Sequence, residues 1–414
     1  MYTHNRNQVF KKMEQQSFAV FFSGIAPLST ADEQYPFEVN RNFFYLTGIE
    51  QEDVVLVLFK GAGLEKALLF IEPVDPVQAL WVGAGFTKEE AMLKSGITDI
   101  YDRKDLDSVI SRYLQDSRAA IFGAIKNLYL DLERRDIRHM PTLANQYGQM
   151  MTSKYPNLIV GNLHSELGEL RSVKHPEEIE TMKHAIKITK EGIEALYHAA
   201  KPGIKEHQLE AHYNFVLNQH GVKPSFGTIA AQGGNATILH YRKNNAMIEK
   251  DSLILFDLGV QYEMYCSDIT RTFPVSGKFT ERQKAYYEIV LEANKRSIEF
   301  LKPGVTFKEW NDFGKKILAE GLIKLGKIKE ESEVTKYYYH SLGHFLGLDV
   351  HDVGNYTKPF EAGQVLTVEP GLYIADEGIG IRIEDNVLLT PNGRINLSES
   401  IIKEVKDLEA FMKK

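Results

Sequence analysis

Cysteine is almost absent from the 414-residue sequence, which contains only Cys266. One thiol cannot form an intrachain disulfide, so the sequence is typical of a reducing compartment and we predict a cytoplasmic protein. An excess of positive charge is also absent, because the sequence has 49 lysines and arginines and 56 aspartates and glutamates. The resulting net charge of -7 argues against a nucleic-acid partner. No apolar run is long enough to cross a membrane, and residues 1–8 lack the apolar segment of a signal peptide, so we expect no membrane partner.

The composition that remains is normal for a globular protein, with 43% hydrophobic and 25% charged residues. The length suggests two or three domains. We place a boundary near residue 170, because Pro176 followed by two acids is typical of a helix start. We therefore expect one domain over residues 1–170 and a second over residues 171–414. A long amphipathic helix is predicted from Glu177 to about Ala200.

Residues 1–170 have the pattern of an α/β domain. Short apolar runs bounded by glycine, proline or charge predict strands, and helical patterns lie between them. The predicted strands are Phe18–Phe22, Val54–Phe59, Ala67–Ile71, Ala119–Phe122 and Leu128–Leu132, and the clearest predicted helices are Lys88–Ser95 and Asp105–Asp116.

An acid, Asp257, directly follows the apolar run Leu253–Phe256. A carboxylate at the end of a buried strand needs a partner, usually a metal or a hydrogen-bond donor. If the chain turns near residues 262–263, Asp257 and Asp268 lie opposite each other with Cβ atoms roughly 4.5–5.5 Å apart. Two carboxylates at this distance repel each other, and one stays protonated unless a cation holds both.

The same arrangement recurs later in the chain. The apolar run Val365–Val368 leads into Glu369, and a second run, residues 380–383, leads into Glu384. A turn within Ala375–Gly378 would place these two acids opposite each other. Two ordinary hairpins with surface acids are the alternative. All four acids lie in apolar runs rather than on polar faces, which favours a buried site.

Three histidines, His340, His344 and His351, lie within twelve residues between the two predicted hairpins. Gly343 and Gly347 disfavour a regular helix here, so we predict a strand-loop segment. An isolated histidine is more often structural, but three beside four buried acids indicate a site with one metal ligand and two hydrogen-bonding or proton-transfer groups. Four carboxylates and one imidazole suit manganese, magnesium or cobalt. Two divalent ions would balance the four negative charges, an arrangement known in hydrolases.

Five motifs of this sequence resemble those of the pita-bread metallopeptidases, and within them aminopeptidase P and prolidase. The resemblance implies an α/β (α+β) fold with an N-terminal mixed-sheet α/β domain and a C-terminal pita-bread domain, in which two curved halves enclose the site. It extends into the N-terminal domain through residues 41–48 and 80–83. The five motifs, in the family's order, are residues 257–259, 268–274, 343–352, 368–371 and 380–385.

The C-terminal half contains a weak internal repeat that agrees with this fold. A predicted helix followed by Lys201-Pro-Gly203 is echoed by a predicted helix followed by Lys302-Pro-Gly304. Each of these segments precedes one of the acid-bearing hairpins. We therefore predict a duplication of two helix-helix-strand-strand halves, with the metals at a pseudo-twofold seam.

The resemblance implies a set of five metal ligands. Asp268 and Glu384 would bridge two divalent ions, Asp257 would bind one of them, and His344 and Glu369 would bind the other. Manganese is the expected metal, with cobalt or zinc as alternatives.

The resemblance also implies the catalytic groups. Glu369 would accept the proton of the attacking water and pass it to the leaving nitrogen. His240, His340 and His351 would hold the substrate and stabilise the oxyanion. Arg382 lies two residues before Glu384 and so shares its strand face, which favours a role in holding the metal carboxylates. Binding of a substrate carboxylate is the less favoured alternative.

These roles together imply an Xaa-Pro aminopeptidase, which releases the N-terminal residue from peptides with proline in second position. A prolidase acting on Xaa-Pro dipeptides is the alternative. A metal-free, creatinase-like hydrolase or a catalytically inactive binding module should have lost ligands, and all five are present. A serine hydrolase would need a Gly-x-Ser-x-Gly frame, and Ser341 does not lie in one.

The family commonly forms dimers or tetramers through its N-terminal domain, so we expect a homodimer or homotetramer. Trp81 matches a family tryptophan that approaches a neighbouring subunit's site, and a local core or interface position is the alternative. Asn42 stands where many bacterial relatives carry an acid, so a role of that acid across the subunit interface does not transfer directly.

Overall fold

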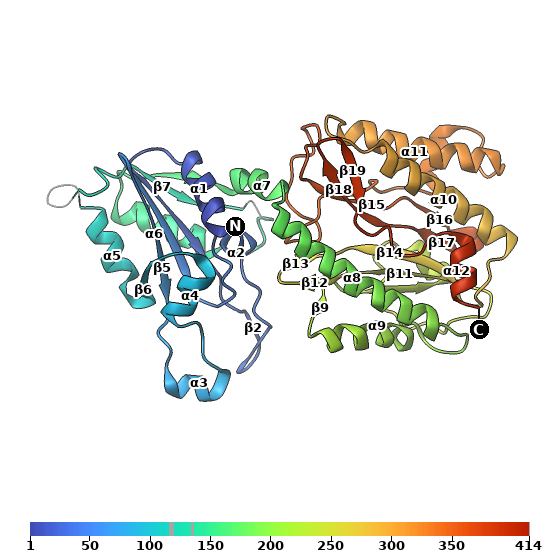
Figure 1. Cartoon of the computed structure of the whole chain (residues 1–414), viewed down its shortest axis with the longest axis horizontal. Helices are drawn as coiled ribbons and strands as arrows, with labels where there is room; N and C mark the ends of the chain where they lie inside the picture. Colours follow the sequence, from blue (N-terminus) through green and yellow to red (C-terminus); the bar gives the residue numbers. More distant parts are fainter. Residues whose placement is uncertain (116–119, 134–135, 414) are drawn as a thin grey trace. The chain divides into compact units, whose positions relative to one another are not determined.

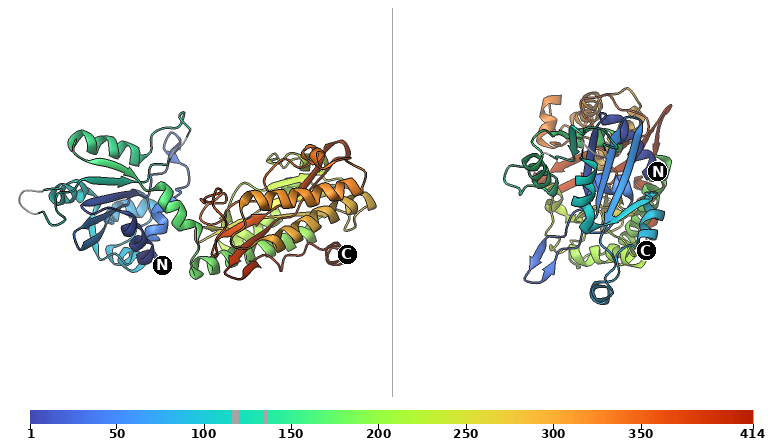
Figure 2. Two further views of the ribbon diagram at one scale, coloured as in Figure 1. Left: turned by 90° about the horizontal axis from the view of Figure 1, so that it is seen from above. Right: turned by 90° about the vertical axis from the view of Figure 1, so that its left-hand side faces the viewer.

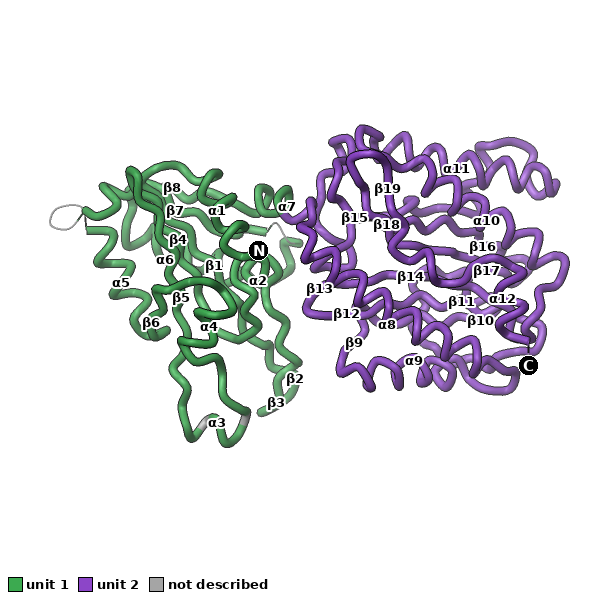
Figure 3. Tube along the Cα trace, in the orientation of Figure 1, with its two compact units in different colours: residues 1–170 green, residues 171–414 purple. Residues whose placement is uncertain are grey.

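The computed structural model describes residues 1–115, 120–133 and 136–413. The chain divides into two compact units, Met1–Leu170 and Arg171–Lys414 (Figures 1 and 3). Each unit is built around its own cluster of buried apolar side chains. Among the described residues, none of the helices combines the length and the apolar character needed to cross a membrane.

The first unit contains a six-stranded sheet in the order β6-β5-β4-β1-β7-β8. Its central strand β1 runs antiparallel to β4 and parallel to β7, so the predicted mixed sheet is confirmed. Four of the five predicted strands lie in this sheet. Its strands are β1 (Ser17–Phe22), β4 (Val55–Gly61), β5 (Leu64–Ile71), β6 (Asp99–Asp102), β7 (Asn127–Leu130) and β8 (Ile159–Asn162).

Helices α5 (Leu106–Tyr113) and α6 (Leu143–Lys154) pack their apolar side chains against one face of this sheet. The predicted helix over residues 88–95 is confirmed as α4 (Lys88–Ser95). The unit also contains α1 (Tyr2–Lys12), α2 (Arg41–Thr47), α3 (Pro76–Val82), the 3-10 turn η1 (Arg103–Asp105), the hairpin β2 (Leu28–Thr30) and β3 (Glu33–Gln34), and most of α7 (His164–Ser172).

The predicted strand Ala119–Phe122 is wrong. Ala119 lies outside the described residues, and the next residues form a turn in which the Gly123 N–H donates to the Ala120 carbonyl at 3.0 Å. The Phe122 ring is buried and stacks on Phe59 at 5.0 Å between ring centroids. The apolar character of this run therefore comes from a turn that packs into the core, which strand patterning does not distinguish from a strand.

Trp81 lies on α3 and is 85% exposed, so the local core position is wrong. Leu80 beside it is 86% exposed and Val77 is 66% exposed. Asn42, in contrast, is buried within the first unit and donates to Asp131 at 2.9 Å.

The second unit repeats one order of elements twice. Helices α8 (Pro176–Ala199) and α9 (Glu206–His220) precede the hairpin of β11 and β14, and α10 (Glu281–Phe300) and α11 (Phe307–Lys324) precede the hairpins built from β15 to β18. The long predicted helix and the duplicated element order are confirmed. The four helices pack into one apolar cluster with the strands. Figure 2 shows the helices of this unit running alongside its strands.

The strands of this unit form small antiparallel sheets, in the orders β10-β11-β14, β13-β12-β9, β15-β18-β19 and β16-β17. The strands of the site are β10 (Ile229–Gln232), β11 (Leu253–Leu258), β14 (Ile269–Pro274), β15 (Val365–Val368), β16 (Gly371–Ile374), β17 (Ile379–Arg382) and β18 (Asp385–Thr390). The others are β9 (Lys223–Pro224), β12 (Val260–Tyr262), β13 (Tyr265–Cys266) and β19 (Gly393–Asn396), with the 3-10 turns η2 (Gly233–Thr237), η3 (Glu331–Lys336) and η4 (Ala375–Glu377), and α12 (Val405–Phe411).

Candidate active site

The first acid-bearing hairpin forms as predicted, but its register differs. The chain turns at Glu263 and Met264, both with positive φ, and Asp257 pairs with Thr270. Asp268 therefore lies diagonal to Asp257, and the prediction that the two are directly opposed is wrong by two residues. An even shift keeps both acids on one face of the hairpin.

The turn at Glu263 and Met264, one residue later than predicted, accounts for this difference, because the register is the same on both sides of Gly259. Gly259 instead marks an interruption of the ladder. A Cβ atom at Gly259 would lie 1.9 Å from the carbonyl oxygen of Ser267, so the chains approach closely where the ladder of β11 and β14 ends. The ladder resumes between β12 and β13 with the partners Gln261 and Cys266. Asp268 thus lies in an interruption of the sheet rather than within a strand.

The second hairpin has the predicted register. Val368 pairs with Asp385 and Gly371 pairs with Arg382, so Glu369 and Glu384 face each other between two ladders. The turn lies at η4 and ends at Gly378, as predicted.

Helix α10 holds the gap between these two ladders. The side-chain amide of Asn294 is buried and donates to the Val368 carbonyl at 3.0 Å and to the Ile383 carbonyl at 3.3 Å. Each of these carbonyls immediately precedes one of the two acids. One helical residue therefore fixes the backbone that presents Glu369 and Glu384.

The histidine segment is a loop with one isolated bridge, Phe345 to Leu366, so the predicted non-helical segment is confirmed. The His344 ring donates through Nδ1 to the Phe345 carbonyl at 2.9 Å. This contact leaves Nε2 facing Asp268 Oδ2 at 3.5 Å and Glu369 Oε1 at 3.6 Å. A backbone contact at Nδ1 that directs Nε2 toward carboxylates is the arrangement of a metal-binding histidine.

One cavity of ≈ 440 Å³ brings together all nine residues that the sequence singled out. Phe307, Tyr356 and Leu239 add apolar walls to this cavity. The nine are His240, Asp257, Asp268, His340, His344, His351, Glu369, Arg382 and Glu384.

The acids of this cavity fit a bound cation. Asp268, His344 and Glu384 each offer a ligand atom, and these atoms all lie within 4.8 Å of one another. Among the described residues, buried oxygens of Asp257 (Oδ1), Asp268 (Oδ1) and Glu384 (Oε1) have no hydrogen-bond partner. A buried carboxylate oxygen without a donor is costly, and a divalent ion would remove that cost.

The pKa values of three of the acids and of His344 also indicate a cation site. Burial and the neighbouring charges of Asp257 and Glu369 raise the pKa of Asp268 to about 7. Burial also raises the pKa values of Glu369 and Glu384. Burial opposes a charge on His344, but its contact with Asp268 and the charge of Glu369 raise its pKa to about 9. Without a cation, this site therefore retains protons at neutral pH.

Arg382 is buried and holds three groups of the site. Its guanidinium donates to Asp257 Oδ2 at 2.6 Å, to Thr270 Oγ1 at 3.1 Å and to the Tyr373 hydroxyl at 3.0 Å. Thr270 Oγ1 in turn donates to Glu384 Oε2 at 2.7 Å. This geometry favours a role in holding metal carboxylates over contact with a substrate.

His340 has both ring nitrogens engaged. Nδ1 donates to the Ser341 carbonyl at 2.7 Å, and Nε2 lies 2.8 Å from the Tyr373 hydroxyl. Burial, together with the charge of Arg382, lowers the His340 pKa to about 4, so the ring is neutral near pH 7 and Nε2 accepts from Tyr373. The oxyanion contact that the sequence suggests for His340 would need a free N–H, which this arrangement does not leave.

Sequence reasoning missed Tyr373, which joins His340 to Arg382. The alternation of side chains along a strand could have identified it, because Glu369, Gly371 and Tyr373 are two residues apart and share one face of the hairpin. Thr270 was also missed, although it lies two residues after Asp268 and opposite Asp257.

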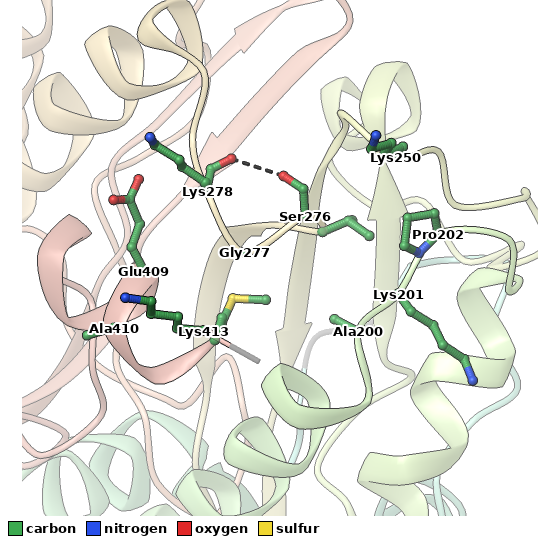
Figure 4. Close-up of a pocket in the computed structure, with 12 residues that line it drawn as sticks. Ala200, Lys201, Pro202, Lys250, Ser276, Gly277, Lys278, Glu409, Ala410 and Lys413 are labelled. Atoms are coloured by element: carbon green, nitrogen blue, oxygen red, sulfur yellow. Dashed lines mark hydrogen bonds between the residues drawn. The ribbon is translucent and has the colours of Figure 1, made fainter.

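A second cavity of ≈ 800 Å³ lies elsewhere in this unit (Figure 4). Lys201, Lys250, Lys278 and Lys413 line it, and its one acid among the described lining residues, Glu409, accepts from the Phe279 N–H at 3.1 Å. It is the larger of these two cavities, but its described lining residues offer no set of metal ligands. The smaller, acid-lined cavity is therefore the candidate active site.

Comparison with known proteins covers nearly the whole chain. Residues 180–391 match the model of metallopeptidase family M24, and residues 2–122 match that of the aminopeptidase P N-terminal domain. The Xaa-Pro aminopeptidase of Haemophilus influenzae is 35% identical, over 99% of this chain and 96% of the relative.

Solved structures agree with these matches. A candidate aminopeptidase P from Bacillus anthracis is 43% identical with a TM-score of 0.96, over 100% of this chain and 97% of that one. Zinc-substituted aminopeptidase P of Escherichia coli in complex with product is 31% identical with a TM-score of 0.89, over 99% of this chain and 97% of that one.

Proposed function

The chain belongs to the aminopeptidase P family of M24 metallopeptidases, and on this basis we propose that it is a metal-dependent Xaa-Pro aminopeptidase. The observation that carries the proposal is the convergence of four carboxylates and the His344 imidazole on a single cavity. The substrates would be peptides with proline in second position. Cleavage of Xaa-Pro dipeptides, the activity of a prolidase, is the second candidate.

We propose that Asp257, Asp268, His344, Glu369 and Glu384 hold two divalent cations, with manganese as the first choice. When bound, such ions lower the pKa of water and polarise the scissile carbonyl. The unpartnered carboxylate oxygens and the direction of His344 Nε2 support this ligand set.

The other side chains of the cavity transfer protons, contact the substrate or position their neighbours. Glu369 accepts a proton from the attacking water and returns it to the proline nitrogen as the C–N bond breaks. His240 and His351 lie exposed on the cavity and donate to the substrate carbonyl oxygen as it becomes negative. His340 positions the Tyr373 hydroxyl, and through it Arg382, rather than contacting the oxyanion.

A homodimer or homotetramer and a cytoplasmic location complete the proposal. The exposed apolar side chains of α3 support an oligomer. The single cysteine supports a reducing compartment.

The test is turnover of Arg-Pro-Pro beside Gly-Pro by chelator-treated protein, with and without added manganese. Metal-restored cleavage of the tripeptide with little cleavage of the dipeptide is expected. The reverse preference would make the protein a prolidase. If neither peptide is cleaved after manganese, cobalt or zinc is added, the proposed function fails. Glu369→Ala is the matched control and should abolish cleavage.

A further inference from the structure

Glu206 is a fully buried acid outside the candidate active site. It lies in the first turn of α9, and its exposed fraction is 0%. Both of its carboxylate oxygens are fully engaged. Oε1 accepts from the Gln232 backbone N–H at 2.9 Å and from Asn235 Nδ2 at 3.1 Å. Oε2 accepts from the Tyr241 hydroxyl and from the Ala246 backbone N–H, both at 2.9 Å.

These four donors belong to one segment, residues 232–246, which connects β10 to β11. His240 lies within it, with two of the donors before it in sequence and two after it. One carboxylate oxygen therefore holds the limb that precedes His240, and the other holds the limb that follows. The Glu206 N–H also donates to the Ala246 carbonyl at 3.0 Å, which closes the base of the segment.

His240 itself is exposed on the active-site cavity. Among the described residues, no hydrogen bond, ion pair or ring contact holds its imidazole. The position of the ring is therefore set by the backbone of the segment, and a central anchor of that backbone is the Glu206 carboxylate.

We propose that Glu206 is a positioning residue for His240, acting through the segment 232–246 to hold the imidazole at the cavity. This inference rests on the proposed peptidase function, in which His240 contacts the substrate. A carboxylate is suited to the task because it accepts four hydrogen bonds and donates none. A glutamine at this position would turn an NH₂ group toward two donors.

The test is a double-mutant cycle with Glu206→Gln and His240→Ala, measured as kcat and KM for Arg-Pro-Pro with manganese present. Glu206→Gln should lower kcat/KM by about 10- to 100-fold, because small misplacements of a catalytic group cost rates of this order. In the His240→Ala background the same substitution should change kcat/KM by less than about twofold, since the group it positions is gone. An equal loss in both backgrounds would indicate general structural damage and overturn the proposal, as would a single variant with wild-type kinetics.

Tyr241→Phe provides a milder variant if Glu206→Gln does not fold. It removes one of the four donors, and its smaller loss should likewise disappear when His240 is replaced by alanine. A loss that persists would overturn the proposal. Glu191→Gln is the control, because Glu191 is a partly exposed acid on α8 that pairs with His220 at 2.7 Å.

Hydrogen exchange gives a readout that does not depend on activity. Peptides covering residues 232–246 should exchange faster in Glu206→Gln than in wild type, while peptides of α11, which packs against α10 and η3 rather than against this segment, should not change. Unaltered exchange in residues 232–246 would overturn the proposal. An inactive wild-type enzyme would instead refute the peptidase function, so the two failures are distinguishable.

Discussion

Arg382 contacts three groups of the candidate site with one side chain. Its planar fork reaches Asp257, Thr270 and Tyr373 at once, and a lysine ammonium cannot reproduce that geometry. We expect Arg382→Lys to lower the affinity for manganese by about 10- to 100-fold, as is typical when a group that orients a metal ligand is lost.

Calorimetric titration of chelator-treated protein measures this affinity directly. Arg296→Lys is the control, because Arg296 lies partly exposed on α10, away from the site, with an ion pair to Glu292 at 3.9 Å and its guanidinium over the Phe313 ring. Wild-type manganese affinity in Arg382→Lys would contradict the role of the guanidinium as a holder of Asp257.

Asp352 follows His351 and is buried between two cations, with Arg171 at 2.5 Å and Lys174 at 3.0 Å. Burial opposes ionisation, but the two cations lower its pKa below the ordinary 3.8. A depressed carboxylate pKa contributes stability that is present above the unfolded pKa and is lost as pH falls through the folded value. Asp352→Asn should therefore destabilise the second unit by about 3–5 kcal/mol at pH 7.

Urea unfolding monitored by tryptophan fluorescence tests this, because Trp310 is fully buried in the second unit and Trp81 is exposed. The difference between wild type and Asp352→Asn should shrink as pH falls below 3.8. A difference that stays constant down to the acid limit would show that the ion pairs are not its source.

Among the elements of the fold, the hairpin of β16 and β17 depends on a close approach at Gly380. A Cβ atom there would lie 2.1 Å from the Ala236 carbonyl oxygen, in η2 of the segment that carries His240. Gly380→Ala should push this segment away from the hairpin. We expect a loss of about 1–3 kcal/mol in stability and a lower kcat/KM for Arg-Pro-Pro.

Gly234→Ala is a matched control within the same segment, because a Cβ atom there meets nothing within 4 Å. It should change the urea midpoint and the kinetics little. Equal effects of the two substitutions would indicate that loss of glycine, rather than contact with Ala236, is responsible.

The sequence predicts an element well where its signal is local. Glu369 and Glu384 end two apolar runs around a tight turn, and that symmetry suffices to give their register. The motifs also predict the family, the metallopeptidase class and an N-terminal α/β domain followed by a pita-bread domain, which the comparisons confirm.

The sequence fails where the exact turn, or a contact between distant segments, decides the outcome. The register at Asp257 depends on a turn at Glu263 and Met264, one residue later than the spacing of the acids indicates. Glu206 has an ordinary helical context, and its link to Tyr241, 35 residues away, exists only in the folded chain. The roles proposed for His344 in metal binding and for His340 in orienting Tyr373 likewise depend on which ring nitrogen contacts a backbone carbonyl.

At the scale of the whole molecule, the least explained surface is the exposed face of α3. Val77, Leu80 and Trp81 expose most of their apolar side chains on one short helix of the first unit. A group of exposed apolar side chains is typical of a protein contact surface, whereas single exposed apolar residues are normal. A contact between copies of the chain would bury these side chains and explain why the exposed face of α3 is apolar.

Light scattering coupled to size-exclusion chromatography measures the assembly. We expect wild type to elute as a dimer or tetramer, and Leu80→Asp to shift it toward the monomer because a charge at a desolvated contact is costly. Leu93→Asp is the control. Leu93 is also 82% exposed, but the other exposed apolar residue of its helix, Met92, is only 39% exposed, so α4 does not present a comparable apolar surface. A monomeric wild type, or equal shifts in both variants, would show that α3 does not hold the assembly together.

If the activity on Arg-Pro-Pro falls when the oligomer dissociates while the affinity for manganese is unchanged, the partner subunit contributes to substrate binding rather than to the metal site.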